Sequence, residues 1–159
     1  QTPHINITDM PESQYDSITG INLKGVWACM KHEIPVILQS GAGAIVNVSS
    51  IGGVVGTAGE SVYTATKHGI IGMTKASALE YARRGVRINA VCPGAIYTPM
   101  GDTLLKSAPG LEETLEATIP LGRLGEAKEI AEAIYWLASP KSSYVVGHSL
   151  VVDGGITIQ

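Results

Sequence analysis

The sequence predicts an α/β fold in which helices cover both faces of a doubly wound parallel sheet. The apolar run at 44–49 lacks clean polar alternation, which is typical of a parallel strand buried on both faces. A second such run occupies 86–91 and ends sharply at Pro93-Gly94. Residues 61–84, between the two runs, show helical periodicity, so strands and helices alternate as they do in parallel α/β proteins.

The N-terminal part is expected to be irregular over residues 1–9 and then to form one long helix. Pro11-Glu12 places a proline and an acid in the first turn, which is a common helix start. The helix should run to about Leu38, and Pro35 is expected to kink or restart it. The glycines at 41 and 43 then form a turn into the strand at 44–49.

A glycine-rich loop separates this strand from the helix predicted at 61–84. We interpret Gly53, Gly56 and Gly59 as flexibility in the loop, because their spacing is not that of a phosphate-binding motif. Gly85 should cap the helix in the left-handed conformation. Small residues recur along one stripe of this helix, where another backbone could approach closely: Ala65, Gly69, Gly72 and Ala76.

The C-terminal third contains one helix and one strand after a broken segment. Residues 98–120 mix apolar residues with glycine and proline, which indicates a short, interrupted helical pair. A mobile lid over the substrate is the favoured interpretation, and an ordinary surface excursion is the alternative. Glu126 should begin the next helix, which Ser139-Pro140 ends, and a last strand is expected at 149–152.

Composition excludes several classes of function. The chain has 159 residues and 45% hydrophobic content, enough for the core of one domain. Its net charge of −3 gives no electrostatic footprint for nucleic acid, and no apolar run is long enough to span a membrane. The histidines lack metal-ligand spacing, so no metal site is expected. Cys29 and Cys92 are expected to be buried thiols in a reducing compartment, which predicts a cytoplasmic protein.

The candidate chemistry lies between Ser50 and Lys67. Tyr63 and Lys67 are four residues apart, so on a helix they share one face, and Ser50 lies where the preceding strand ends. A phenol can transfer a proton, a nearby ammonium favours its anion, and a hydroxyl can hold the substrate oxygen. The structural alternative for this pair is a tyrosine packed in the core and a solvated lysine.

With Ser50 upstream, the Tyr63–Lys67 pair resembles the active site of the short-chain dehydrogenase/reductase family. Five motifs in compatible order support the resemblance from about Pro11 to the C-terminus: Ile21-Asn22-Leu23-Lys24-Gly25, Asn47-Val48-Ser49-Ser50, Asn89-Ala90-Val91-Cys92-Pro93-Gly94, Pro120-Leu121-Gly122-Arg123 and Val152-Asp153-Gly154-Gly155. The resemblance implies a Rossmann-like sheet and NAD or NADP as cofactor. It also implies a homo-oligomer, most often a tetramer.

The resemblance also implies roles for individual residues. Asn22, Ser50, Tyr63 and Lys67 would form the catalytic set, in which Asn22 holds a water and Lys67 also binds the nicotinamide ribose. The segment after the second strand would cradle the nicotinamide, together with Tyr63 and Lys67, through Pro93, Gly94, Ile96 and Thr98. The substrate would contact Ser50 and four further residues, most of them apolar: Ile51, Ala95, Tyr97 and Met100.

The sequence therefore predicts an NAD(P)-dependent oxidoreductase that interconverts a secondary alcohol and a ketone, with Tyr63 as general acid or base. A related epimerase or dehydratase and an inactive binding protein of the same fold are the alternatives. Residues 1–159 are expected to be the C-terminal catalytic part of one domain, because only three strands are found and no glycine-rich phosphate loop precedes them. We expect these residues alone to be inactive.

Overall fold

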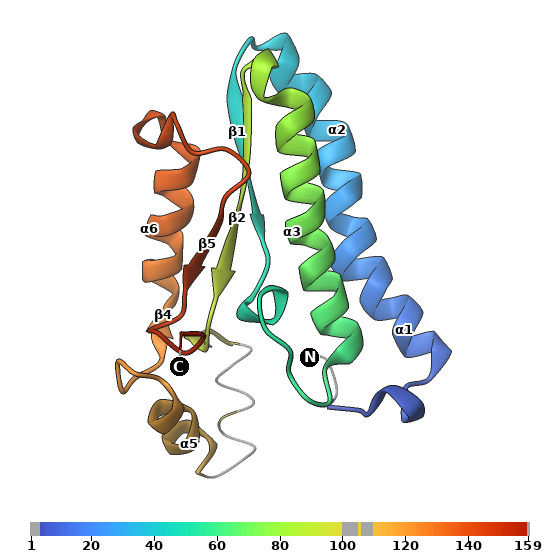
Figure 1. Ribbon diagram of the computed structural model, residues 1–159, viewed down its shortest axis with the longest axis vertical. Helices are drawn as coiled ribbons and strands as arrows, with labels where there is room; N and C mark the ends of the chain where they lie inside the picture. Colours follow the sequence, from blue (N-terminus) through green and yellow to red (C-terminus); the bar gives the residue numbers. More distant parts are fainter. Residues whose placement is uncertain (1–3, 100–104, 106–109, 159) are drawn as a thin grey trace.

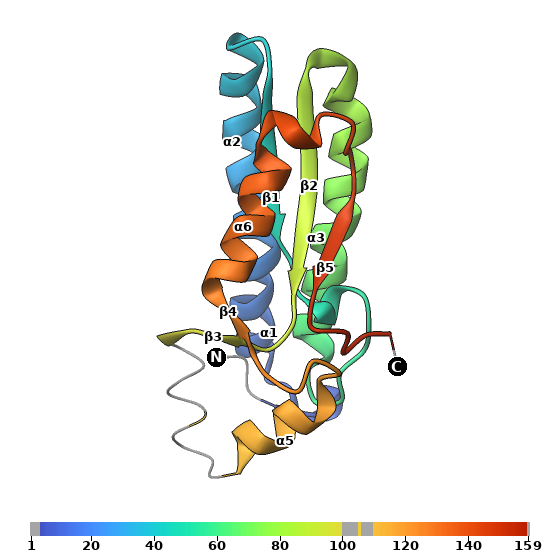
Figure 2. The same ribbon diagram turned by 90° about the vertical axis from the view of Figure 1, so that its left-hand side faces the viewer.

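The computed structural model describes residues 4–99, 105 and 110–158, and these form three layers. The central layer is a parallel sheet of β1 (Gly43–Val48), β2 (Val86–Pro93) and β5 (Ser149–Val152), in the order β1-β2-β5. Helices α2 (Gly25–Gln39) and α3 (Ser61–Tyr81) cover one face, and α6 (Ala127–Ala138) covers the other (Figures 1 and 2). The predicted α/β class and its parallel sheet are confirmed.

The long N-terminal helix is confirmed, with one irregularity. After a 3₁₀ turn at Ile7–Asp9, helix α1 (Glu12–Thr19) continues into a π-helical segment, Gly20–Lys24, and from there into α2. Pro35 lies inside α2, which continues past it to Gln39. The one wide turn therefore lies at Asn22, and the proline does not end the helix.

Helix α3 ends as the sequence predicts. A 3₁₀ turn at Ala82–Arg84 follows it, and Gly85 has a φ of 84°, which is left-handed. The small-residue stripe does not face the sheet: Ala65, Gly72 and Ala76 are exposed. Gly69 instead faces Leu23 of the π-helical segment, where an added Cβ would lie 2.8 Å from Leu23 Cδ1.

A second, very short sheet was not predicted from the sequence. Strands β3 (Ile96–Tyr97) and β4 (Gly125–Glu126) pair in parallel, two residues each, too few to give a periodic pattern. One strand precedes the segment predicted as a lid and the other follows it, so their pairing brings the chain before and after that segment together. Within that segment the structure describes α5 (Leu111–Thr118), whereas Met100 and most of the residues up to 109 lie outside the described residues.

The buried core lies between β1, β2 and the two helices α2 and α3. It contains Met30, Ile34, Ile45, Ala78, Val86 and Ile88. Among the described strands β1 pairs only with β2, so its other edge is open, and a groove of about 900 Å³ runs between that edge and α2. Cys92 is buried as expected, but the expectation for Cys29 is wrong: its thiol is exposed, on the side of α2 that lines this groove.

Candidate active site

The end of β1 turns sharply and presents Ser50 beside α3. Ser50 caps the 3₁₀ turn Ile51–Gly53, and its Oγ accepts a hydrogen bond of 3.1 Å from the Gly52 amide. Gly53 is buried in this turn, so its interpretation as a flexible residue is wrong. An added Cβ at Gly53 would lie 2.5 Å from Ser49 Oγ, which shows that close packing requires the glycine.

Tyr63 and Ser50 approach each other across Gly52. An added Cβ at Gly52 would lie 3.3 Å from Tyr63 Cε1 and 3.6 Å from Ser50 Oγ. Tyr63 stands in the first turn of α3, whose N-terminus follows the loop from the same strand end. The phenol ring of Tyr63 and the hydroxyl of Ser50 therefore both lie next to Gly52.

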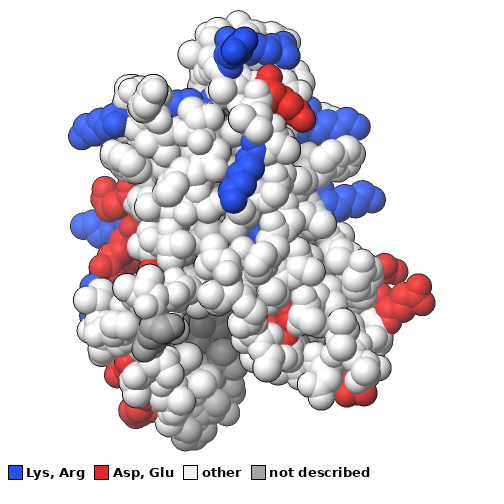
Figure 3. Space-filling view, viewed as in Figure 1, with Lys and Arg blue, Asp and Glu red and all other residues white. Residues whose placement is uncertain are grey.

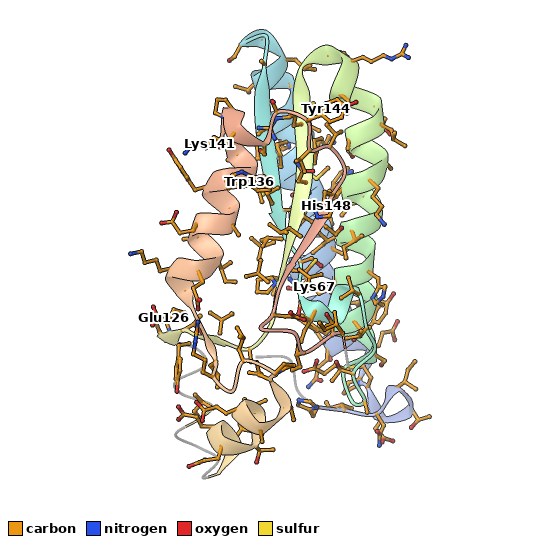
Figure 4. All side chains as sticks on the ribbon, turned by 60° about the vertical axis from the view of Figure 1, so that its left-hand side comes forward. Lys67, Glu126, Trp136, Lys141, Tyr144 and His148 are labelled. Atoms are coloured by element: carbon orange, nitrogen blue, oxygen red, sulfur yellow. The ribbon has the colours of Figure 1, made fainter. Side chains whose placement is uncertain are left out.

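Lys67 lies one turn further along α3. Its Nζ is 5.5 Å from the centroid of the Tyr63 ring and donates a hydrogen bond of 3.3 Å to the Val48 carbonyl oxygen. Burial lowers the pKa of Lys67, and the nearby Cys92 thiol opposes this. Figure 4 shows Lys67 near the carboxyl end of the strands. Lys67 is therefore partly buried beside Tyr63 and is not a fully solvated surface charge.

Asn22 lies in the π-helical segment, which packs against α3. Leu23 of that segment contacts the backbone at Gly69, two residues beyond Lys67. π-Helical turns inside α-helices are frequent at functional sites, because they displace a backbone group from the regular hydrogen-bond ladder. Asn22 therefore lies where the regular hydrogen-bond ladder of the N-terminal helix is interrupted.

The segment 93–98 follows β2 at the same edge of the sheet. The Gly94 amide donates a hydrogen bond of 3.0 Å to the Val152 carbonyl oxygen. An added Cβ at Gly94 would lie 2.8 Å from Asp153 Cα. Ile96 and Tyr97 form β3, and Tyr97 and Thr98 are exposed. The candidate cofactor residues Pro93, Gly94, Ile96 and Thr98 thus lie at the carboxyl end of β2, and Met100 lies outside the described residues.

Asp153 and Glu129, for which the sequence predicts no role, make polar contacts near this edge. Asp153 accepts hydrogen bonds from the amides of Gly155 and Thr157 and from the Thr157 hydroxyl. Burial opposes ionisation of Asp153, but these bonds outweigh it and lower its pKa. Glu129 forms a bidentate ion pair with Arg123, at 2.9 and 2.8 Å, next to the β3–β4 pair. The sequence signal that could have identified Asp153 is its position directly after a strand and before two glycines.

The surface carries no sign of a nucleic-acid interface on the face seen in Figure 3. Lysine and arginine are scattered mainly around its outline and interspersed with acids. Among the described residues no three His, Cys, Asp or Glu side chains gather as a metal site would require. No described helix combines the length and apolarity that crossing a membrane needs.

Comparison with known proteins decides the family. A family described as Enoyl-(Acyl carrier protein) reductase matches residues 1–157. The chain belongs to the short-chain dehydrogenase/reductase family. It is 45% identical over 149 residues to a 3-oxoacyl-[acyl-carrier-protein] reductase of Thermotoga maritima, covering 94% of this chain and 59% of that protein.

Two further proteins are similar to this chain over nearly its whole length. An A-factor type gamma-butyrolactone 1'-reductase of Streptomyces virginiae is 44% identical over 150 residues, which cover 94% of this chain and 58% of that protein. The solved structure of ElxO with NADP bound has a TM-score of 0.93 and 34% identity, and the match covers 99% of this chain and 63% of ElxO. The chain therefore spans about three fifths of the length of these relatives.

Proposed function

We propose that this protein is an NAD(P)-dependent oxidoreductase that interconverts a secondary alcohol and a ketone. The observation that carries the proposal is the convergence of Ser50, Tyr63 and Lys67 at the carboxyl end of the sheet. Open parallel α/β sheets bind their ligands at this end. The apolar residues beside it, among them Ile51, Ala95 and Ile96, favour a partly hydrophobic ketone over a multiply charged one.

The residues present fit the nicotinamide-ribose end of a dinucleotide. An ammonium has three donors, and within the described part of the chain Lys67 uses one, toward Val48, which leaves donors for ribose hydroxyls. The segment 93–98 provides backbone groups and the Thr98 hydroxyl next to this position. A bound nicotinamide would supply the hydride. NADP is the form bound in the ElxO structure, and we propose NAD or NADP here.

The chain's own residues would move the proton. Tyr63 donates its phenolic proton to the oxygen that becomes the alcohol, and Ser50 donates a hydrogen bond to the same oxygen. Lys67, whose ammonium lies near the Tyr63 ring, favours the phenolate left behind. Asn22, in the wide turn of the N-terminal helix, would hold a water that resupplies the proton. In alcohol oxidation the same groups act in reverse.

We also propose that residues 1–159 are the C-terminal catalytic part of a single domain. The open edge of β1 and the groove beside it support this, because an unpaired apolar strand edge is an aggregation hazard that a further strand would cover. We expect these 159 residues alone to bind no dinucleotide. The exposed small residues of α3 and the exposed Val151 of β5 support contact with other copies, for which we propose a tetramer in the cytoplasm.

One experiment tests the proposed activity. The intact protein is titrated with NADH and with NADPH, followed by turnover assays with a 3-oxoacyl thioester, a neutral cyclic ketone and a multiply charged ketone. We expect tight binding of one nucleotide and its oxidation with at least one of the first two substrates. Binding of a nucleotide without reduction of any ketone would instead support the inactive binding protein.

A further inference from the structure

Ser49, the residue before the proposed catalytic serine, makes a long-range contact that the reaction itself does not use. Its side chain is buried, with 3% of its surface exposed, at the end of β1. Its Oγ donates a hydrogen bond of 3.0 Å to the backbone carbonyl oxygen of Lys67. The contact joins residues 18 positions apart, from the end of the strand to the second turn of α3.

Lys67 is tied to the same strand end a second time. Its ammonium donates to the carbonyl of Val48, the last residue of β1. The side chain of Lys67 is thus hydrogen-bonded to Val48, and its backbone carbonyl is hydrogen-bonded to the adjacent residue, Ser49. These two bonds fix Lys67 along and around the helix axis relative to the strand that leads to Ser50.

The surrounding packing leaves the Ser49 hydroxyl little freedom. A Cβ at Gly53 would lie 2.5 Å from Ser49 Oγ and 2.9 Å from the Lys67 carbonyl oxygen, so the turn closes directly over this hydrogen bond. Cys92 of β2 lies on the same side: burial raises the pKa of its thiol, and hydrogen bonds to Ser49 and to the backbone at Ser50 oppose the rise. The hydrogen bond between Ser49 and Lys67 is therefore enclosed by the turn at Gly53, by β2 at Cys92 and by α3 at Lys67.

We propose that Ser49 is a positioning residue for the proton transfer, which holds Lys67 and, through α3, Tyr63 at their distances from Ser50. This inference rests on the proposed oxidoreductase function. Small displacements of reacting groups lower rates steeply, by as much as about 10²-fold for a shift of 1 Å. Loss of the Ser49 bond should therefore lower turnover although Ser49 touches neither substrate nor cofactor.

The test compares Ser49→Ala with Ser142→Ala in the intact protein. Ser142 is a matched control, because it is also buried, at 1% exposure, and its Oγ also donates to a helix carbonyl, that of Leu137 at 2.9 Å. It lies at the opposite end of the sheet from the site. Reduction of a 3-oxoacyl thioester by the preferred nucleotide is followed from acidic to basic pH, and denaturant unfolding is measured for each variant.

For Ser49→Ala we expect a kcat roughly tenfold lower and a half-maximal pH for reduction that moves upward, because Lys67 no longer holds its place beside Tyr63. Ser142→Ala should lose comparable stability and keep both the kcat and the pH profile. Lys67, Tyr63 and Cys92 are the titratable groups at this position, and Ser142→Ala leaves all three in place.

If Ser49→Ala does not fold, Ser49→Cys is used instead to test the positioning role of Ser49. A thiol fills similar space but donates only a weak hydrogen bond, so the same changes in a smaller degree are expected. A folded Ser49 variant with the parent's kcat and pH profile, or a Ser142→Ala that shifts the profile equally, would overturn the inference. If the parent protein itself shows no turnover, both the proposed function and the role of Ser49 are overturned. If the parent turns over and only the Ser49 result fails, the role of Ser49 alone is overturned.

Discussion

The two ends of the sheet differ in how their polar groups are held. At the amino end, Arg87 of β2 donates hydrogen bonds to four backbone carbonyls and one hydroxyl at the end of α6, from Leu137, Ala138, Ser139 and Ser142. At the carboxyl end, Lys67 is partly desolvated and donates to a single described carbonyl. Figure 4 shows the two ends, with Lys67 near one and Lys141 and Tyr144 near the other.

The difference indicates where stability and where function reside. The Arg87 guanidinium satisfies orphan carbonyls at a helix C-terminus, where a cation is also favoured by the helix dipole. Asn89 adds two more hydrogen bonds at this end of the sheet: its side-chain amide donates one to the Val145 carbonyl oxygen and accepts one from the His148 backbone amide. The Lys67 ammonium, by contrast, is partly buried, and burial lowers its pKa, as is common for groups at functional sites. Variants at the two ends should therefore separate activity from stability.

The largest effect is expected at Tyr63. Tyr63→Phe removes the transferable proton and keeps the ring, so turnover should be abolished while folding and nucleotide affinity stay nearly intact. Tyr81→Phe, at the other end of α3, is the matched control and should keep the parent's activity. Steady-state reduction of a ketone measures both variants. Turnover of Tyr63→Phe within about tenfold of the parent would remove Tyr63 from the role of acid.

Lys67→Met should separate activity from stability at one residue. We expect a loss of turnover on the order of 10²–10⁴-fold, because the phenolate loses its cation. Since burial lowers the pKa of Lys67, folding disfavours its charged form, and the neutral methionine should raise the free energy of unfolding. The parent's own stability should rise with pH as the pH approaches 10.5, whereas the variant's should not. Denaturant unfolding across this range checks both.

Arg87→Met should show the opposite behaviour. Several carbonyls at the end of α6 lose their donor, so the free energy of unfolding should fall by about 3 kcal/mol. The folded fraction should keep the parent's KM and pH profile, because Arg87 lies far from the site. Arg83→Met, on an exposed turn, is the control and should change stability little. A loss of activity in Arg87→Met without a loss of stability would contradict this division.

The smallest effect is expected at the Arg123–Glu129 pair, which is solvent-exposed. Hydrogen bonds from Arg123 and from the Glu126 amide lower the pKa of Glu129 from 4.5 to about 2. The depressed value means that the pair stabilises the fold above pH 4.5 and that this contribution fades as the pH falls toward 2. Glu129→Gln should therefore unfold slightly more easily near neutrality and equal the parent near pH 2. Urea midpoints at several pH values measure this.

The strong periodic elements of this fold were predictable because each depends on local sequence. Gly85 as a left-handed cap, the strand ends at Ser49-Ser50 and Pro93-Gly94, and the Tyr63–Lys67 spacing required no tertiary information. Contacts between distant segments were not predictable. The role of Gly53 depends on Ser49 and Lys67 lying against it, and the exposure of Cys29 depends on an open strand edge. The two-residue strands β3 and β4 are too short for any pattern.

The central claim is that Ser50 and Tyr63 act on one oxygen as a single proton-delivering unit. Its most direct test is the residual turnover of the double variant Ser50→Ala/Tyr63→Phe, measured at high enzyme concentration and compared with that of each single variant in the intact protein. Groups that act as a unit have non-additive effects, so the double variant should be no slower than Tyr63→Phe alone. If the two losses multiply instead, Ser50 and Tyr63 act independently and do not form a single proton-delivering unit.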